Sequence, residues 1–499
     1  MKKIDFRGGV LALLLGIEIT TLFLGIKSFG NKNNTLDDIK LLDNKSNNLF
    51  AIMVKDASGN YNEANNFPSG AYILNETMSS CIDNNGNKID NILSYADGFV
   101  SATTNKTVYC YLYFDKDNTV YAKLLDDYEN NKGVQKITDE NGKDVYYYTG
   151  NITNNNLVFN NYCWKMVRTA EIDGVKLIYN GVYKEDTKCN NTGTDVYLEA
   201  SRTKYNKNYN SPAYVGYMYG TVYAYSTKSA SSFGIYYYGS DVTWNGTTYT
   251  LNDAESGAIA DMYSKLSSKH YTCLSTSSSC STVYYIYNMR SATGIAYYMT
   301  LTNGKKIEDV LDEMLNYNTT NSNIKAVIDN WYSTYMTNAT DYLENAIYCN
   351  NRNISNLGGW NPSGGSLTTY LRFNDYSNLR LTCQDKEDQF TLKVDSGGTL
   401  GYGNNALDYP VGLLTSKEAN LAFGGSNTNY LKNGDWYWLL SPDYFDYNTA
   451  VVRRVDNGSL YSDYVDLARG ARPAISLKKN IKITGGTGEI DEPYIISLT

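Results

Sequence analysis

The chain has 499 residues, a formal net charge of −8 and a hydrophobic content of 42%, which is enough for more than one folded core. The acidic balance excludes nucleic acid as the partner, because phosphate binding needs a basic surface. With one His and no CxxC pair, the chain has too few ligands for a zinc site of the Cys/His type.

The N-terminus combines a basic flank, residues 1–8, with an apolar segment, residues 9–26, that is interrupted by Glu18. This pattern is typical of either a cleaved signal peptide or a membrane anchor. We favour an uncleaved transmembrane helix over residues 9–26, with the flank in the cytoplasm and the remaining chain outside the cell. Residues 27–47 are polar and are expected to form a stalk.

Short strand signals separated by Asn, Gly and Asp predict a small β-domain over residues 48–155. Residues 107–114 (TVYCYLYF) show the alternation of a strand with one buried face.

A larger domain is expected over residues 156–480, followed by a C-terminal strand or tail over residues 481–499. Residues 204–250 are rich in Tyr, Gly, Ser and Asn, which predicts irregular, loop-rich structure. Apolar residues at helical spacing predict neighbouring helices over residues 307–315 and 324–332. Thr415 and Glu418 have the spacing of a capping box, which predicts a third, short helix.

The eight cysteines lie between residues 81 and 383, and their even number favours disulfides formed outside the reducing cytosol. Many connectivities are open, and pairing in sequence order closes the shortest loops. The expected pairs are Cys81–Cys110, Cys163–Cys189, Cys273–Cys280 and Cys349–Cys383.

The two most specific sequence motifs are residues 435–442 (DWYWLLSP) and 469–477 (RGARPAISL). This frame resembles the C-terminal half of C-type-lectin-like domains of the formylglycine-generating-enzyme (sulfatase-modifying factor) type, in an uncharacterised branch found in bacterial surface proteins. Residues 162–169 and 409–415 resemble parts of the same architecture, and the resemblance covers residues 156–480. It implies an α+β chain with a C-type-lectin-like head of irregular, loop-rich β structure and a helix pair, after a small β-domain and the transmembrane helix.

The residues that carry out catalysis or bind calcium in related families are not found in this sequence. Formylglycine-generating enzymes use cysteines in their C-terminal part, and here no Cys follows Cys383. The Trp-Asn-Asp and Glu-Pro-Asn motifs of calcium-dependent lectins are also missing, so calcium is unsupported and no cofactor is expected. The only His, His270, has no nucleophile–base frame around it, and no catalytic motif is found. We therefore do not expect an enzyme.

The segment between the two motifs is rich in the residues that antibody paratopes use, because Tyr gives a large contact area and short polar residues give adaptable hydrogen bonds. The alternative is a pair of hydrophilic loops in a chain with 49 tyrosines. The predicted ligand-binding residues are Asp443, Tyr444, Phe445, Asp446, Tyr447, Asn448, Arg453, Tyr461, Asp463 and Tyr464.

Three functions remain open. The leading one is a cell-surface binding protein or adhesin that recognises an extracellular protein or glycan and contacts the membrane through its N-terminal helix. The second is a structural envelope or fibre component that binds its own copies. The third is an extracellular carbohydrate-active enzyme, whose paired carboxylates cannot be recognised from sequence spacing.

Overall fold

The computed structural model describes residues 49–498 except 57, 69–71, 97–98, 103, 105–106, 173, 230–240, 245–246, 251–269, 276–306, 355–369, 374–378, 394–401 and 447–448. The chain divides into two compact units, Met1–Val134 and Gln135–Thr499. The division falls before residue 155, the boundary expected from sequence, because β10 (Asp144–Tyr148) pairs with β12 (Tyr162–Thr169) of the second unit.

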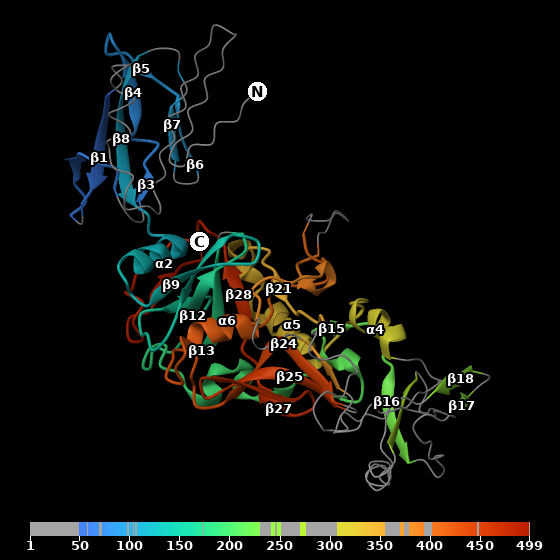
Figure 1. Cartoon of the computed structure of the whole chain (residues 1–499). Helices are drawn as coiled ribbons and strands as arrows, with labels where there is room; N and C mark the ends of the chain where they lie inside the picture. The colour runs from blue at the N-terminus through green and yellow to red at the C-terminus, as the bar shows by residue number, and fades with distance from the viewer. Residues whose placement is uncertain are drawn as a thin grey trace. The chain divides into compact units, whose positions relative to one another are not determined.

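The first unit is built on a six-stranded sheet, drawn in blue in Figure 1. Cys110, Leu112 and Phe114 of its central strand are at most 1% exposed, whereas Tyr111 between them is 43% exposed, so the predicted alternation is present. The spatial order of the strands is β2 (Tyr61–Ala64), β1 (Leu49–Lys55), β8 (Val108–Lys116), β4 (Ser80–Asp83) and β5 (Lys88–Ile89), with β3 (Tyr72–Leu74) also paired to β8. The unit also contains the hairpin β6 (Leu93–Ala96) with β7 (Phe99–Ala102), and the helix α2 (Val120–Glu129).

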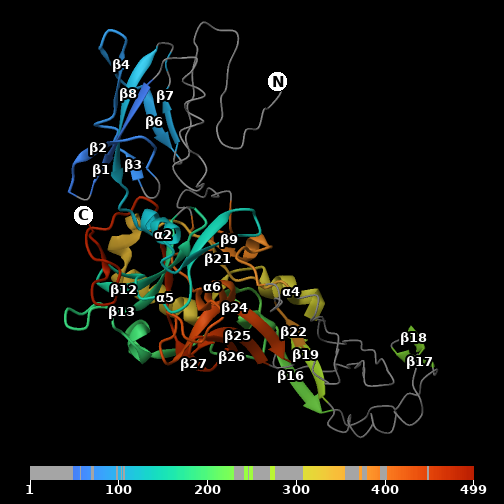
Figure 2. The same cartoon turned by 60° about the vertical axis from the view of Figure 1, so that its left-hand side comes forward.

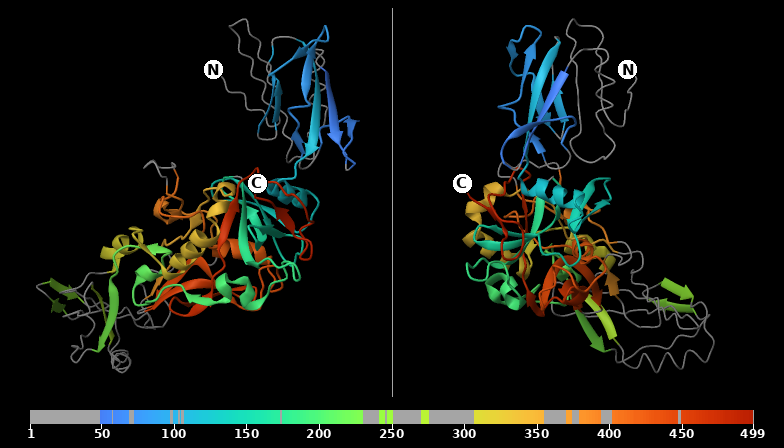
Figure 3. Two further views of the ribbon diagram at one scale, coloured as in Figure 1. Left: turned by 180° about the vertical axis from the view of Figure 1, so that it is seen from behind. Right: turned by 90° about the vertical axis from the view of Figure 1, so that its left-hand side faces the viewer.

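The second unit has two larger sheets, seen from behind in the left panel of Figure 3. The first sheet joins strands from both ends of the unit, and the expected C-terminal strand pairs in parallel with a strand more than 300 residues earlier. Its order is β28 (Ala474–Leu477), β13 (Val175–Val182), β12, β10 and β9 (Val134–Thr138), with β11 (Asn156–Phe159) paired to both β12 and β29 (Tyr494–Ile496).

The second sheet carries the segment that sequence predicts to bind ligand, and its strands lie side by side in Figure 2. Its order is β14 (Arg202–Lys204), β27 (Ala468–Gly470), β24 (Trp436–Asp446), β25 (Thr449–Asp456) and β26 (Ser459–Tyr464), with β22 (Tyr370–Arg372) also paired to β24.

Three helices of the second unit form where the sequence predicts them: α4 (Ile307–Leu315), α5 (Asn323–Tyr335) and α6 (Ser416–Phe423). The capping box of α6 is complete, because Thr415 Oγ1 accepts the Glu418 N–H and the Glu418 carboxylate accepts the Thr415 N–H. Helix α6 contacts β10 of the first sheet and β24–β26 of the second, so it packs between the two sheets (Figure 1).

The expected fold class is wrong. The described part of the chain is mostly β, with 38% of its residues in strands and 18% in helices. Part of the region expected to be irregular, residues 204–250, is paired into short strands, whose Tyr, Thr, Val and Trp residues have high β-propensity. The small two-stranded pairs are β15 (Met218–Tyr219) with β20 (Thr320–Asn321), β16 (Ala224–Ser229) with β19 (His270–Ser275), β17 (Asp241–Trp244) with β18 (Thr247–Thr250), and β21 (Tyr348–Cys349) with β23 (Gln389–Phe390).

The transmembrane helix expected over residues 9–26 stays a prediction. None of the helices in the described residues has the length and apolar character needed to cross a membrane, and residues 9–26 lie outside the described part of the chain.

Three disulfides join cysteines within the described residues: Cys81–Cys110, Cys163–Cys189 and Cys349–Cys383. Each joins cysteines that follow one another in the sequence, as expected. The fourth expected pair, Cys273–Cys280, includes a residue outside the described part of the chain. The bonds indicate a protein of an oxidising environment such as the outside of the cell.

Candidate functional site

A tight turn sets the geometry of the predicted site. Asn457 and Gly458 join β25 to β26 with φ angles of 49° and 87°, as a two-residue type I′ hairpin requires. The resulting register pairs Arg454 with Tyr461. Because directly opposed residues share a face and successive residues alternate, Arg453 belongs to the opposite face. The predicted ligand-binding residues therefore divide between the two faces of one sheet.

One face carries a cluster that we call the aromatic–arginine surface: Trp436, Arg454, Tyr461, Asp463 and Arg469. The guanidinium carbon of Arg454 lies 4.7 Å from the ring centroid of Trp436 and 5.4 Å from that of Tyr461. Arg469 lies 4.6 Å from the Trp436 ring on the same measure. Trp436 is 37% and Tyr461 53% exposed, so large aromatic side chains remain accessible here.

Acidic side chains hold the two arginines in place. Asp463 Oδ2 lies 2.9 Å from Arg454 Nε and 2.8 Å from Arg469 Nε. Asp456 Oδ2 lies 2.9 Å from Arg454 Nη1. Two carboxylates thus balance two guanidinium groups, and the arginines are fixed over the rings without leaving a net charge.

The opposite face buries a second group of predicted residues. Asp443 is 1% and Arg453 5% exposed, and Arg453 Nη2 lies 2.8 Å from Asp443 Oδ1. Ser462 donates its hydroxyl to the other carboxylate oxygen of Asp443. Burial raises the pKa of Asp443 to about 6, although Ser462 opposes the shift. Phe445 is also fully buried, but it lies opposite Ala450 and therefore belongs to the same face as Arg454. The structure thus places Asp443, Arg453 and Phe445 in the interior.

The other predicted residues have mixed positions. Tyr444 is half-buried in β24, and Tyr464 is 48% exposed at the end of β26, opposite Val451. Asp446 ends β24, and its side chain lies outside the described part of the structure, as do Tyr447 and Asn448. Of the predicted set, the structure brings Tyr461 and Asp463 together on the aromatic–arginine surface.

Three residues of this surface were missed from the sequence: Trp436, Arg454 and Arg469. Trp436 and Arg469 lie in the two motifs that carry the family resemblance, where the sequence alone indicates only a role in the fold. The Asn457-Gly458 dipeptide is a signal that could have found Arg454, because a two-residue hairpin turn fixes which residues are opposite each other.

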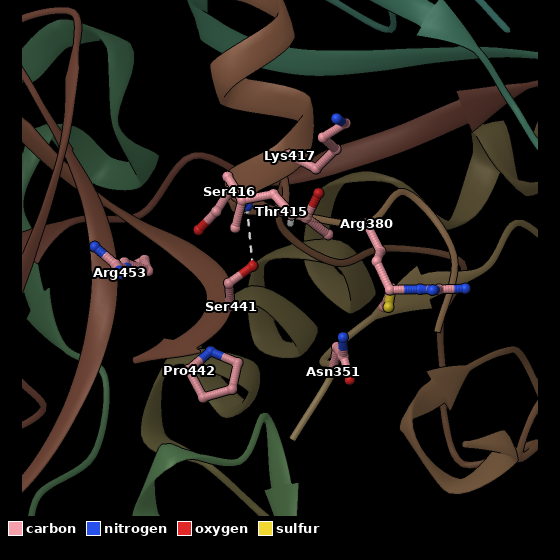
Figure 4. Close-up of a pocket in the computed structure, with 10 residues that line it drawn as sticks. Asn351, Arg380, Thr415, Ser416, Lys417, Ser441, Pro442 and Arg453 are labelled. Atoms are coloured by element: carbon pink, nitrogen blue, oxygen red, sulfur yellow. Dashed lines mark hydrogen bonds between the residues drawn. The ribbon is translucent and has the colours of Figure 1, made fainter. Parts of the chain in front are cut away.

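A hollow of about 370 Å³, part of it open to solvent, lies at the start of α6 (Figure 4). The Ser416 N–H already donates to Ser441 Oγ at 2.9 Å. Figure 4 shows the charged ends of Arg380 and Lys417 extending away from Ser441. These charges do not converge on one point, so the hollow lacks the convergent polar groups of a ligand pocket.

In comparisons with known proteins, no family model, no curated protein and no solved structure matches the chain. The resemblance to C-type-lectin-like domains therefore stays a prediction. In the described residues, no group of three or more His, Cys, Asp or Glu side chains could hold a metal ion.

Proposed function

We propose that the chain is an extracellular binding protein that recognises its ligand, a protein or a glycan, through the aromatic–arginine surface. The observation that carries the proposal is the position of Arg454, which lies over both Trp436 and Tyr461 while the two rings remain exposed.

The composition of this surface supports recognition. Trp, Tyr and Arg are the residues that most often carry the binding energy of protein interfaces. Rings that are already held by guanidinium groups lose little conformational entropy on binding, which favours affinity. The carboxylates of Asp456 and Asp463 neutralise the arginines, so binding should depend on contact area more than on long-range attraction.

The disulfides support a partner outside the cell. The bond between Cys349 and Cys383 and the bond between Cys163 and Cys189 both lie in the unit that carries the surface. Such bonds persist in oxidising compartments. A ligand of this unit is therefore expected among extracellular proteins or glycans.

The test is a binding screen of the full chain against arrays of glycans and extracellular-matrix proteins. Hits are then measured with the variants Trp436→Ala and Tyr461→Ala. Each substitution is expected to raise Kd at least tenfold, because removing a central aromatic contact typically costs about 2 kcal/mol or more. A matched control is Tyr317→Ala, since Tyr317 is 59% exposed and does not belong to the surface.

Ligands that bind all three variants equally would place the binding site elsewhere and contradict the proposal. The structural-component alternative has its own signature. If the wild-type chain binds nothing on the arrays but associates with itself in light scattering, and Trp436→Ala abolishes that association, the surface joins copies of the chain.

A further inference from the structure

Five charged side chains meet inside the second unit, and we call them the charged cluster: Arg168, Glu171, Lys176, Glu344 and Glu418. Glu418 Oε1 lies 2.7 Å from Arg168 Nε and 2.9 Å from Lys176 Nζ. Glu171 Oε1 also contacts both cations. The two cations therefore already have two carboxylates as partners.

Glu344 is the fifth member, and its environment differs from that of the other carboxylates. It is 7% exposed, and its Oε1 has no hydrogen-bond partner among the described residues. Its other oxygen lies against the turn at Gly174, where an added Cβ would come within 2.1 Å of Oε2. Glu171 Oε2 is a second buried carboxylate oxygen without a donor.

The charge count of the cluster favours one bound proton. Three ionised carboxylates against two cations would leave one uncompensated negative charge in the interior, which is strongly unfavourable. A proton on Glu344 removes that charge. It also converts an oxygen that lacks a donor into a donor itself, and Glu171 Oε2 is an acceptor in the same cluster.

We propose that Glu344 holds a proton in the folded protein and that loss of this proton loosens the segment around it, so that the charged cluster acts as a proton-sensitive lock on the second unit. The inference is independent of the proposed function.

Residues 343–349 are positioned for such a role because they connect β28 to the disulfide at Cys349. The Glu344 N–H donates to Ser476 O on β28 at 2.9 Å, and Leu343 forms a β-bridge with Leu477 of the same strand. Five residues after Glu344, Cys349 begins the disulfide to Cys383. Repulsion at Glu344 would therefore act on the attachment of this segment to β28.

The titratable groups that face Glu344 come from several of the elements around it, and β28 contributes none of them. They are Arg168 on β12, Glu171 in the turn after β12, Lys176 on β13, Tyr348 on β21, Tyr402 and, through the shared cations, Glu418 on α6. Burial first, and then repulsion from Glu171, raise the pKa of Glu344 to about 7, against the opposing effects of Lys176 and Arg168.

The direction of the effect follows from this shift. A carboxyl whose pKa is higher in the folded chain than in the unfolded chain binds its proton more tightly when folded. The stabilisation is fully present below pH 4.5, the ordinary value, and is lost as the pH rises through about 7. The lock is closed in acid and opens toward alkaline pH.

The experiment compares the full chain with the variant Glu344→Gln, which keeps the shape of the protonated carboxyl but cannot ionise. Unfolding by urea is measured from pH 5 to pH 8. The ratio of the wild-type to the variant unfolding constant is expected to rise about tenfold per pH unit up to about pH 7. Hydrogen exchange of the Glu344 amide, corrected for its intrinsic pH dependence, should accelerate over the same range in the wild type alone.

Glu489→Gln is the control, because Glu489 is exposed and lies outside the cluster. It should leave the pH profile of the wild type unchanged. A constant ratio of wild type to Glu344→Gln across this range would overturn the proposal. Infrared difference spectroscopy gives a second measurement that does not need unfolding. Buried Asp443, whose pKa is also raised to about 6, contributes equally to both proteins and cancels in the difference. The wild-type spectrum minus that of Glu344→Gln must therefore contain a protonated-carboxyl band at pH 6 that disappears by pH 8, and a difference spectrum without this band would equally refute the assignment.

Discussion

Arg168 on β12 and Glu418 on α6 form a buried ion pair across 250 residues of sequence, with Arg168 Nε 2.7 Å from Glu418 Oε1. Both side chains are at most 4% exposed. The same carboxylate also completes the capping box of α6 through its second oxygen. One residue thus fixes the start of the helix and attaches it to the first sheet of the second unit.

Replacing Glu418 with Ala should therefore be severely destabilising. It leaves Arg168 and Lys176 with one fewer partner in the interior and removes one of the two hydrogen bonds of the capping box. Breaking a buried pair from one side typically costs about 3–5 kcal/mol. Urea unfolding followed by tryptophan fluorescence measures the loss. Asn420→Ala, at an exposed position of the same helix, should change the free energy of unfolding by less than about 0.5 kcal/mol. Equal effects of the two variants would contradict the role of Glu418.

Acid should weaken the protein through the same residue. Burial alone would raise the pKa of Glu418, but Lys176 and Arg168 lower it to about 2. A lowered folded-state pKa means that this stabilisation is present above pH 4.5 and is lost as the pH falls through about 2. The Glu418→Gln variant should lose this part of the acid sensitivity, and unfolding curves between pH 2 and pH 5 measure it. The sign is opposite to that expected for Glu344.

The aromatic packing of α5 gives a third prediction. The Trp331 ring centroid lies 5.5 Å from that of Tyr162, 6.3 Å from that of Trp164 and 5.6 Å from that of Tyr179. Trp331 is 3% exposed, so Trp331→Ala should leave a cavity between the helix and β12–β13 and cost about 3–5 kcal/mol. Trp331→Phe keeps part of the packing and should cost less. Calorimetry of the full chain distinguishes them, and a smaller loss for Ala than for Phe would argue against this packing.

Local patterns predicted local structure well. The capping box at Thr415 and Glu418 and the spacing of apolar residues in α4 and α5 identified helices, because each signal lies within a few turns of chain. The second role of Glu418 could not be predicted in this way, since its partners Arg168 and Lys176 lie more than 200 residues away. The overall class failed for a related reason: short strands with long connections carry weak periodicity, and their pairing is decided by distant residues.

The candidate site shows the same limit. The composition of residues 443–464 indicated a contact surface, but strand alternation places Arg453 on one face, beside Asp443, and its neighbour Arg454 on the other, beside Trp436 and Tyr461. The amino-acid composition of a segment does not show which of its residues share a face of the sheet. Trp436 joins the surface only because β24 pairs with β25, with Trp436 opposite Asp456.

Gly470 on β27 provides the last prediction, and it tests the motif that carried the family resemblance. A Cβ at this position would come within 2.2 Å of the ring of Tyr197. That ring cannot easily move away, because Tyr197 is 1% exposed and its hydroxyl accepts a hydrogen bond from Asn433 at 3.2 Å. Gly470→Ala should therefore destabilise the chain by about 1–3 kcal/mol through overpacking.

The matched control is Gly485→Ala, since an added Cβ there would meet no atom within 4 Å. Thermal unfolding should show a lower Tm for Gly470→Ala and little change for Gly485→Ala. Because the two sites interact directly, Gly470→Ala should lower Tm less when it is introduced into the Tyr197→Leu variant than when it is introduced into the wild type. Strict additivity of the two substitutions would show that the Tyr197 ring is not what requires glycine in this motif.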